Sequence, residues 1–180
     1  MKKIPLLIFS LFMSIGWGQC SGCNTLFNFC NEILDNYNFC SPIDIDILEE
    51  IVVLNNLDIE LVDLGYQEWV GGRLKNFILI NNNIIELPNS FGGLTSLEGL
   101  DLEFNSIITL PESIGDLSSL KYLDISSNNI QYLPETFFGL YNLKTLGLYN
   151  NDLTFVQNDI ELLTNLEFIN LSFNQLIIYN

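Results

Sequence analysis

The sequence contains no histidine, and it has only 6 lysine and arginine residues against 22 aspartate and glutamate residues, for a formal net charge of −16. Proteins bind nucleic acids and anionic membranes through clustered basic side chains, so this charge argues against both partners. The absence of histidine removes the side chain most often used for acid–base catalysis near neutral pH. A basic protein, a cation or a neutral polymer is the more natural partner.

Cysteine is absent after residue 40, and the four that occur are Cys20, Cys23, Cys30 and Cys40. In an oxidising compartment, an even and clustered set predicts two disulfides that staple a small subregion. A zinc site and a Cys20–Cys23 redox pair are the alternatives, but the spacing lacks paired CxxC motifs and the surroundings lack a strand–motif–helix context. If residues 24–37 are helical, Cys23 and Cys30 are about 10 Å apart along the axis, which favours Cys20–Cys23 and Cys30–Cys40. Spacing alone leaves the connectivity open.

The N-terminus predicts export. Lys2 and Lys3 precede an uncharged, largely apolar stretch from Ile4 to Gly18, as in a secretory signal peptide cleaved before Gln19. A buried helix or membrane anchor is less favoured, because the apolar run is short for a span of about 20 residues. A lipid anchor at Cys20 is a further alternative. We therefore expect residues 1–18 to be removed, no membrane span in the mature chain, and a secreted or cell-surface location, which would be periplasmic in some bacteria.

Five leucines recur at intervals of 23 residues and define the repeat on which the fold depends: Leu74, Leu97, Leu120, Leu143 and Leu166. Each unit opens with the pattern L-x-x-Φ-x-Φ-x-x-N-x-Φ, in which Φ is Leu, Ile or Phe. The alternation of apolar residues predicts a strand with one buried face, and the later three- or four-residue spacing predicts a helical return. Because one unit cannot close a core, four full units and a partial fifth are expected to stack.

The repeat resembles the leucine-rich repeat family, and "LPxxΦGxLxx" in the second and third units is similar to its 23-residue subtype. The resemblance implies an α/β fold: a right-handed β–α solenoid with a concave parallel β-sheet and a helical or 3₁₀ convex side. With the cysteine pattern, we expect a helical, disulfide-stapled N-terminal cap before it. The resemblance also implies that the asparagine at position nine points inward and bonds the backbone of its own and the adjacent turn. That ladder comprises Asn82, Asn105, Asn128, Asn151 and Asn174.

Residues 19–73 are expected to form the cap that shields the apolar end of residues 74–180. Its second predicted helix starts with Ser41 as N-cap and Pro42 at the first position, and presents Ile43, Ile47, Ile51 and Leu54 to the core. The segment after it supplies a turn at Gly71–Gly72 and buries Trp69. At the other end of the chain, apolar residues are expected to leave an open edge: Leu171, Leu176, Ile177 and Ile178.

The candidate ligand site lies among the exposed strand positions, which differ from unit to unit. Strands stand about 4.8 Å apart, so Asp101, Glu103 and Asp124 should form one acidic cluster. Adjacent like charges are unfavourable unless something compensates them, and aromatic residues beside charge are typical of interface anchors. Calcium held by the three carboxylates is a weaker alternative, and no resident metal or cofactor is predicted. The predicted concave-face site is Asp101, Glu103, Phe104, Tyr122, Asp124, Ser126, Tyr149 and Phe168.

These patterns predict a binding protein rather than an enzyme. No glycine-rich phosphate loop follows a strand, and although carboxylate pairs could serve a glycosidase, a regular repeat array offers no enclosed pocket. We expect a non-enzymatic secreted or surface protein whose concave sheet binds a protein or peptide with basic groups. The alternatives are an assembly scaffold that self-associates through the open C-terminal edge, and the recognition fragment of a longer multidomain chain.

Overall fold

The computed structural model describes residues 40–177. The expected signal peptide at 1–18, the helix expected within 24–37 and the cysteines at 20, 23 and 30 lie outside this range, as does Ile178. Cys40, at the boundary, is buried. The repeat array and the second half of the expected cap are therefore the parts whose structure is known.

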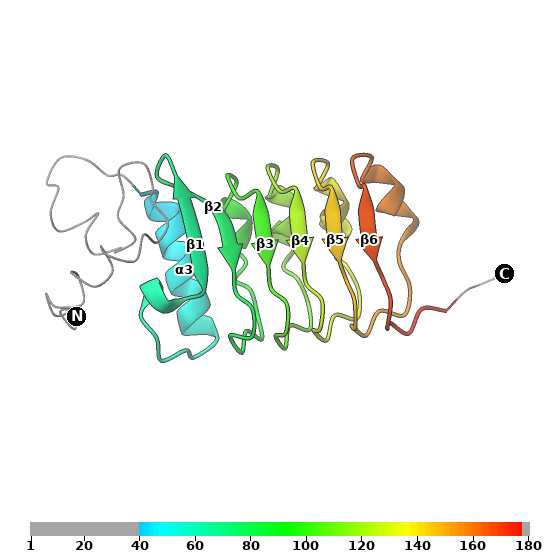
Figure 1. The fold of residues 1–180 in the computed structure, drawn as a ribbon, viewed down its shortest axis with the longest axis horizontal. Coiled ribbons are helices and arrows are strands. Elements are labelled where there is room, and N and C mark those ends of the chain that lie inside the picture. The colour runs from blue at the N-terminus through cyan, green and yellow to red at the C-terminus, as the bar shows by residue number, and fades with distance from the viewer. Residues whose placement is uncertain (1–39, 178–180) are drawn as a thin grey trace, which may run out of the picture.

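A single sheet runs the length of the described chain (Figure 1). Five of its strands, β2 to β6, are parallel neighbours in sequence order, and β1 pairs antiparallel with β2. Corresponding residues of successive repeats pair directly, as Tyr122 does with Gly99 and Thr145, so the 23-residue period is also the register of the sheet. The strands are β1 Tyr66–Val70, β2 Arg73–Ile78, β3 Gly99–Asp101, β4 Tyr122–Asp124, β5 Thr145–Gly147 and β6 Phe168–Asn170.

The return segments of the repeats are 3₁₀ turns on the opposite side of the core (Figure 1). Pro111 and Pro134 stand directly before two of them and have an extended backbone. They end the part of the repeat that leads from the strand to the 3₁₀ turn, which we call the descending segment. Between sheet and turns the repeat leucines Leu74, Leu97, Leu120 and Leu143 are fully buried. The turns are η2 Phe91–Gly93, η3 Glu112–Asp116, η4 Glu135–Gly139 and η5 Asn158–Leu162; a further turn, η1 Leu61–Asp63, precedes the sheet.

Helix α3, Pro42–Leu54, covers the start of the sheet. Ser41 caps it as its sequence predicts, because the Ser41 side chain accepts a hydrogen bond from the Asp44 N–H. The predicted apolar face is partly wrong: Ile43 and Leu54 are exposed. The helix is rotated so that its buried residues are Asp44, Ile45, Ile47, Leu48 and Ile51.

Burial of Asp44 is explained by the hairpin that follows the helix. Strands β1 and β2 turn at Gly71 and Gly72, both at positive φ, and Trp69 of β1 is buried as expected. The turn brings Arg73 to Asp44, whose carboxylate oxygens each lie 3.0 Å from Arg73 Nε. Asp44 Oδ2 also accepts the Leu74 N–H at 2.9 Å. One buried carboxylate thus connects the cap helix to the first repeat.

The last strand, β6, forms the far edge of the sheet among the described residues. Several apolar side chains near it are exposed, including Phe168, Phe173 and Ile177, while Leu171 is only partly buried. None of the helices within residues 40–177 has both the length and the apolar character needed to cross a bilayer.

Candidate functional site

The concave sheet places the predicted carboxylates next to one another. Asp101 of β3 and Asp124 of β4 are register partners, and Glu103 follows two residues after Asp101 at the same end of the strands. Asp101 Oδ1 accepts the Glu103 N–H at 3.0 Å, and Asp124 Oδ1 accepts the Ser126 N–H at 2.9 Å. These bonds hold both aspartates against their own strand ends.

The next strand makes room for this arrangement. Gly147 of β5 is the register partner of Asp124, and a Cβ atom at that glycine would lie 2.3 Å from Asp124 Oδ1. The Asp124 carboxylate therefore occupies the space that a side chain of the neighbouring repeat would otherwise fill. Position five is therefore irregular, with a glycine after two aspartates, and this glycine makes room for the acidic cluster.

Proximity and partial burial perturb the ionisation of this cluster. Desolvation raises the pKa of Asp101, and the negative charge of Asp124 adds to the rise. The pKa of Glu103 is raised by the same two causes, with Asp124 and Asp101 both contributing charge. Desolvation and the surrounding carboxylates raise the pKa of the Tyr122 phenol to about 12. The field of this surface therefore disfavours further negative charge and favours a cation.

Aromatic side chains lie on the same sheet as the carboxylates and at its strand ends. Phe104 is 54% exposed, and Tyr122 and Phe168 are also exposed. Tyr149 packs against Phe173, with ring centroids 5.0 Å apart. Phe173 is 72% exposed and was missing from the predicted site, although it occupies the same repeat position as Phe104. We call Asp101, Glu103, Asp124, Phe104, Tyr122, Tyr149, Phe168 and Phe173 the acidic–aromatic face.

Two of these rings sit on an unfavourable backbone. Position eight has a left-handed conformation in every repeat, with φ of 56° at Phe104 and 59° at Phe173. Asparagine and glycine tolerate this region, whereas a residue with a bulky side chain loses about 1–2 kcal/mol there. Asn81 and Asn150 occupy the same position in other repeats. Phenylalanine at two of the five positions is therefore not explained by backbone stability.

Ser126 does not belong to the binding surface. The alternation predicted an exposed side chain, but Ser126 is 4% exposed and its hydroxyl accepts the Tyr149 N–H at 3.2 Å. The side chain bridges two strand ends, where the next repeat covers it. Its role is structural.

The calcium alternative is also not supported. No group of three or more acidic, cysteine or histidine side chains within residues 40–177 is arranged to hold a metal ion. Asp101 and Asp124 each direct one carboxylate oxygen to a backbone N–H of their own strand end. Those oxygens are therefore not gathered around a common centre.

A second charged feature, not predicted from the sequence, lies at repeat position two. Glu98 bridges Lys75 at 2.7 Å and Lys121 at 2.6 Å, and Lys144 pairs with Glu167 at 3.0 Å. The signal was present, since these residues are 23 apart in sequence. With Arg73 bound to Asp44, every lysine and arginine within residues 40–177 has a carboxylate partner.

The ion pairs at position two predict how the stability of the fold changes at acid pH. Hydrogen bonds from Lys121 and Lys75 lower the pKa of Glu98 from 4.5 to about 2. A depressed carboxyl pKa stabilises the fold above pH 4.5, and this stabilisation is lost as the pH falls from 4.5 toward 2. Glu98→Gln should therefore destabilise the protein above pH 4.5 and have little effect near pH 2, as measured by urea unfolding across this range.

The lysine partners supply the control for that measurement. In a background with Lys75→Met and Lys121→Met, the Glu98→Gln substitution should lose its pH-dependent effect. Asp101 and Glu103 act in the opposite direction, because their raised pKa values make the fold more stable as the pH falls through them. A pH-independent cost of Glu98→Gln would contradict the assigned ion pairs.

The position-nine asparagines form hydrogen bonds between repeats. Asn128, for example, donates to the carbonyls of Leu102, Ile125 and Ser126 at 2.9–3.1 Å and accepts the Ile107 N–H at 2.9 Å. The same pattern, joining each turn to the preceding repeat, recurs at Asn105, Asn151 and Asn174.

Asn82 is different from the other four. Its carboxamide donates to Ile80 O of its own turn and, among the described residues, to no neighbouring repeat. The reason is that the antiparallel strand β1 takes the place of a preceding repeat. The cap is joined to the first repeat instead by Asn55, which was not predicted from the sequence: its side-chain oxygen accepts the Ile85 and Glu86 N–H groups.

The repeating strand, inward asparagine and 3₁₀ return define a leucine-rich repeat solenoid, and residues 72–130 match a family model described as leucine rich repeat. The described chain therefore has the leucine-rich repeat fold, which is a scaffold for protein–protein interaction. No curated protein sequence matches it.

Three solved structures show the same architecture. A leucine-rich repeat protein of Leptospira interrogans is 30% identical over 61% of this chain and 31% of that one, with a TM-score of 0.56. An internalin from Listeria monocytogenes is 30% identical over 58% of this chain and 30% of that one, with a TM-score of 0.51. The ectodomain of the receptor kinase SOBIR1 from Arabidopsis thaliana, 20% identical over 76% and 95% with a TM-score of 0.53, shares the fold. The chain spans about a third of the length of the two bacterial proteins.

Proposed function

We propose that this chain is an exported, non-enzymatic leucine-rich repeat protein that binds a basic segment of another protein through the acidic–aromatic face. The observation that carries the proposal is the register pairing of Asp101 with Asp124 beside Glu103. Like charges in adjacent strands are destabilising on their own. A bound lysine or arginine would offset their repulsion.

Two of the aromatic rings also support a binding role. Phe104 and Phe173 hold left-handed backbone conformations that asparagine would adopt at lower cost. Backbone strain of this kind, retained at an exposed position, is typical of functional surfaces. Exposed rings beside carboxylates can stack on a guanidinium group while the carboxylates neutralise it.

Export and the lack of catalysis belong to the same proposal. Lys2 and Lys3 precede an apolar stretch, as in a signal peptide. The acidic–aromatic face contains no histidine or cysteine, and its aspartates each have one oxygen bound to the backbone. These side chains are better suited to binding a partner than to acid–base catalysis.

The test is selection of peptides from a random displayed library on the wild-type protein. The selected peptides should be rich in arginine and lysine, and the variant Asp101→Asn/Glu103→Gln/Asp124→Asn should bind them at least about tenfold more weakly, since each 1.4 kcal/mol is tenfold in affinity. The matched control neutralises three exposed convex-side carboxylates: Asp116, Asp159 and Glu161. Peptides that bind the concave variant as tightly as the wild type would overturn the site.

Phe104→Asn separates binding from folding in the same assay. Because asparagine accepts the left-handed conformation, the variant should be more stable than the wild type by about 1 kcal/mol, yet bind the selected peptides more weakly. A variant that loses both stability and affinity would indicate that the ring is structural.

A further inference from the structure

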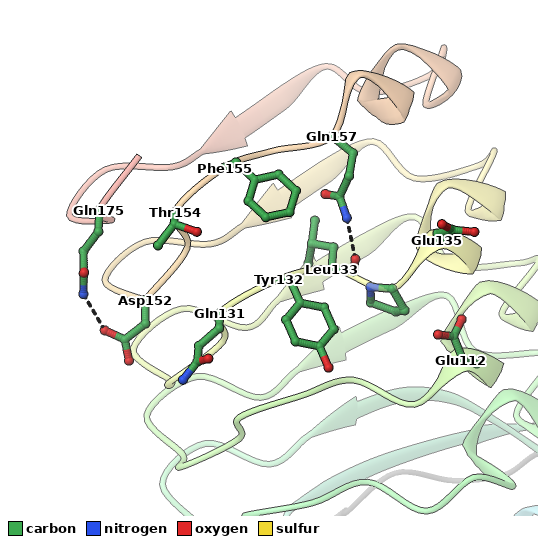
Figure 2. A pocket seen from close by; sticks show the side chains of 11 residues that line it. Glu112, Gln131, Tyr132, Leu133, Glu135, Asp152, Thr154, Phe155, Gln157 and Gln175 are labelled. Carbon is green, nitrogen blue, oxygen red and sulfur yellow. Dashed lines mark hydrogen bonds between the residues drawn. The ribbon is translucent and has the colours of Figure 1, made fainter. Parts of the chain in front are cut away.

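A second surface feature lies on the flank of the solenoid, away from the acidic–aromatic face. It is a hollow of about 660 Å³ between the descending segments of the third and fourth repeats (Figure 2). Its volume is within the range of about 300–1,000 Å³ typical of small-ligand sites. We call it the flank hollow; its lining includes Glu112, Tyr132, Glu135, Asp152, Phe155 and Gln157.

The flank hollow forms where the repeat pattern breaks. The first three repeats carry Leu-Pro at this point, ending in Pro88, Pro111 and Pro134, whereas the fourth carries Val156-Gln157. Gln157 keeps the backbone of those prolines, with φ −63° and ψ 149° against −65° and 154° at Pro134. The substitution therefore changes the side chain without changing the fold.

The Gln157 side chain has a hydrogen-bond acceptor that lacks a partner. Gln157 Nε2 donates to Leu133 O at 2.6 Å, which fixes the orientation of the amide because a carbonyl can only accept. Gln157 Oε1 is then buried, and it is the one such side-chain atom within residues 40–177 that lacks a hydrogen-bond partner. In Figure 2 this oxygen is turned toward the side of the Phe155 ring. The ring is 49% exposed, so a ligand that displaces it can present a donor to Oε1.

The remaining groups of the flank hollow specify what that ligand carries. Its lining holds three carboxylates and no lysine or arginine, and the cations of residues 40–177 are paired elsewhere. One Asp152 oxygen accepts from Gln175 at 2.9 Å, and one Glu112 oxygen accepts from Thr136 at 3.0 Å. Each of these two carboxylates keeps a second oxygen, and Glu135 is exposed, so acceptors and negative charge dominate.

Two half-exposed rings complete the arrangement: Tyr132 and Phe155 are 48% and 49% exposed. A planar cation with several donors satisfies carboxylates, an amide oxygen and aromatic faces together, as guanidinium does. We propose that the flank hollow is a binding site for an arginine side chain of a partner protein, independent of the acidic–aromatic face. A neutral sugar would stack on the rings but would leave the three carboxylates without a counter-charge.

The test is a titration of the purified chain with acetyl-Arg-Arg-Arg-amide, followed residue by residue by NMR. Shifts are expected at the Gln157 side-chain amide, Tyr132 and Phe155, and they should be absent with the citrulline analogue, which keeps the shape but not the charge. Gln157→Pro restores the proline of the other repeats, so it should raise the melting temperature and weaken binding at this site at least about tenfold.

Charge variants distinguish the two surfaces. Glu112→Gln/Glu135→Gln/Asp152→Asn should abolish shifts in the flank hollow and preserve those at Asp101 and Asp124, and the concave triple variant should do the reverse. Three outcomes would overturn the flank site: no shifts there at peptide concentrations up to 20 times those that saturate the acidic–aromatic face or, if that face does not respond, up to the solubility limit; equal shifts with citrulline; or shifts produced by maltose in place of the arginine peptide. Failure here leaves the concave proposal standing, because its shifts are read at different residues.

Discussion

Asp44→Ala is expected to lower the free energy of unfolding by about 3–5 kcal/mol, the usual cost of removing one partner from a buried ion pair. Asp44 is fully buried and accepts hydrogen bonds from Arg73 Nε and the Leu74 N–H. Alanine would leave Arg73 Nε and the buried Leu74 N–H without this acceptor, and would remove the counter-charge of a guanidinium that keeps only neutral acceptors through Nη2. Urea unfolding monitored through buried Trp69 gives the measurement.

The same helix supplies the control. Asp46 lies two residues away on the exposed face of α3, so Asp46→Ala should change the stability by no more than about 0.5 kcal/mol. Adding Arg73→Met to Asp44→Ala should restore part of the lost stability, because it removes the unpaired charge. A cost below about 1 kcal/mol for Asp44→Ala would show that the pair does not hold the cap on the first repeat.

Asn128→Ala should cost about 2–4 kcal/mol, because it removes four hydrogen bonds to the backbone and leaves one buried N–H group unpaired, which alone costs about 1–3 kcal/mol. The unpaired group is the Ile107 N–H, whereas each of the three carbonyls keeps a second donor. Asn128 itself is buried, so water cannot replace the lost bonds without opening the turn. The loss should appear as a lower urea midpoint.

Asn82→Ala is the matched control, since it removes the same side chain from the same repeat position. Asn82 is only partly buried and its amide donates to Ile80 O, so the expected cost is about 0.5–1 kcal/mol. Equal costs at the two positions would mean that the asparagine acts through its own turn and not through contacts between repeats.

Much of this architecture could be predicted from sequence because the fold is periodic. The spacing of Leu97, Leu120 and Leu143 sets both the repeat length and the sheet register, and Gly99, Tyr122 and Thr145 pair as that spacing requires. The Asp101–Asp124 neighbourhood follows from the same register. Ser41 as N-cap was predictable because capping depends on residues within one helical turn.

The features at which the repeat pattern ends or breaks could be seen only in the tertiary structure. Asp44 is buried because Arg73, 29 residues later, is turned onto it by a hairpin that belongs to no repeat. Asn82 loses its rung for the same reason, and Ser126 is buried because the next repeat supplies the Tyr149 N–H.

The same distinction applies to the surface of the protein. The solenoid, its register and the carboxylates on its concave sheet could be predicted from the sequence, because each of these depends on a pattern that repeats. Only the tertiary structure showed that Phe104 has a left-handed backbone and that the flank hollow lies beside Gln157. The left-handed conformation recurs at position eight of every repeat, but phenylalanine carries no local signal for it, and the space between repeats depends on how neighbouring segments pack.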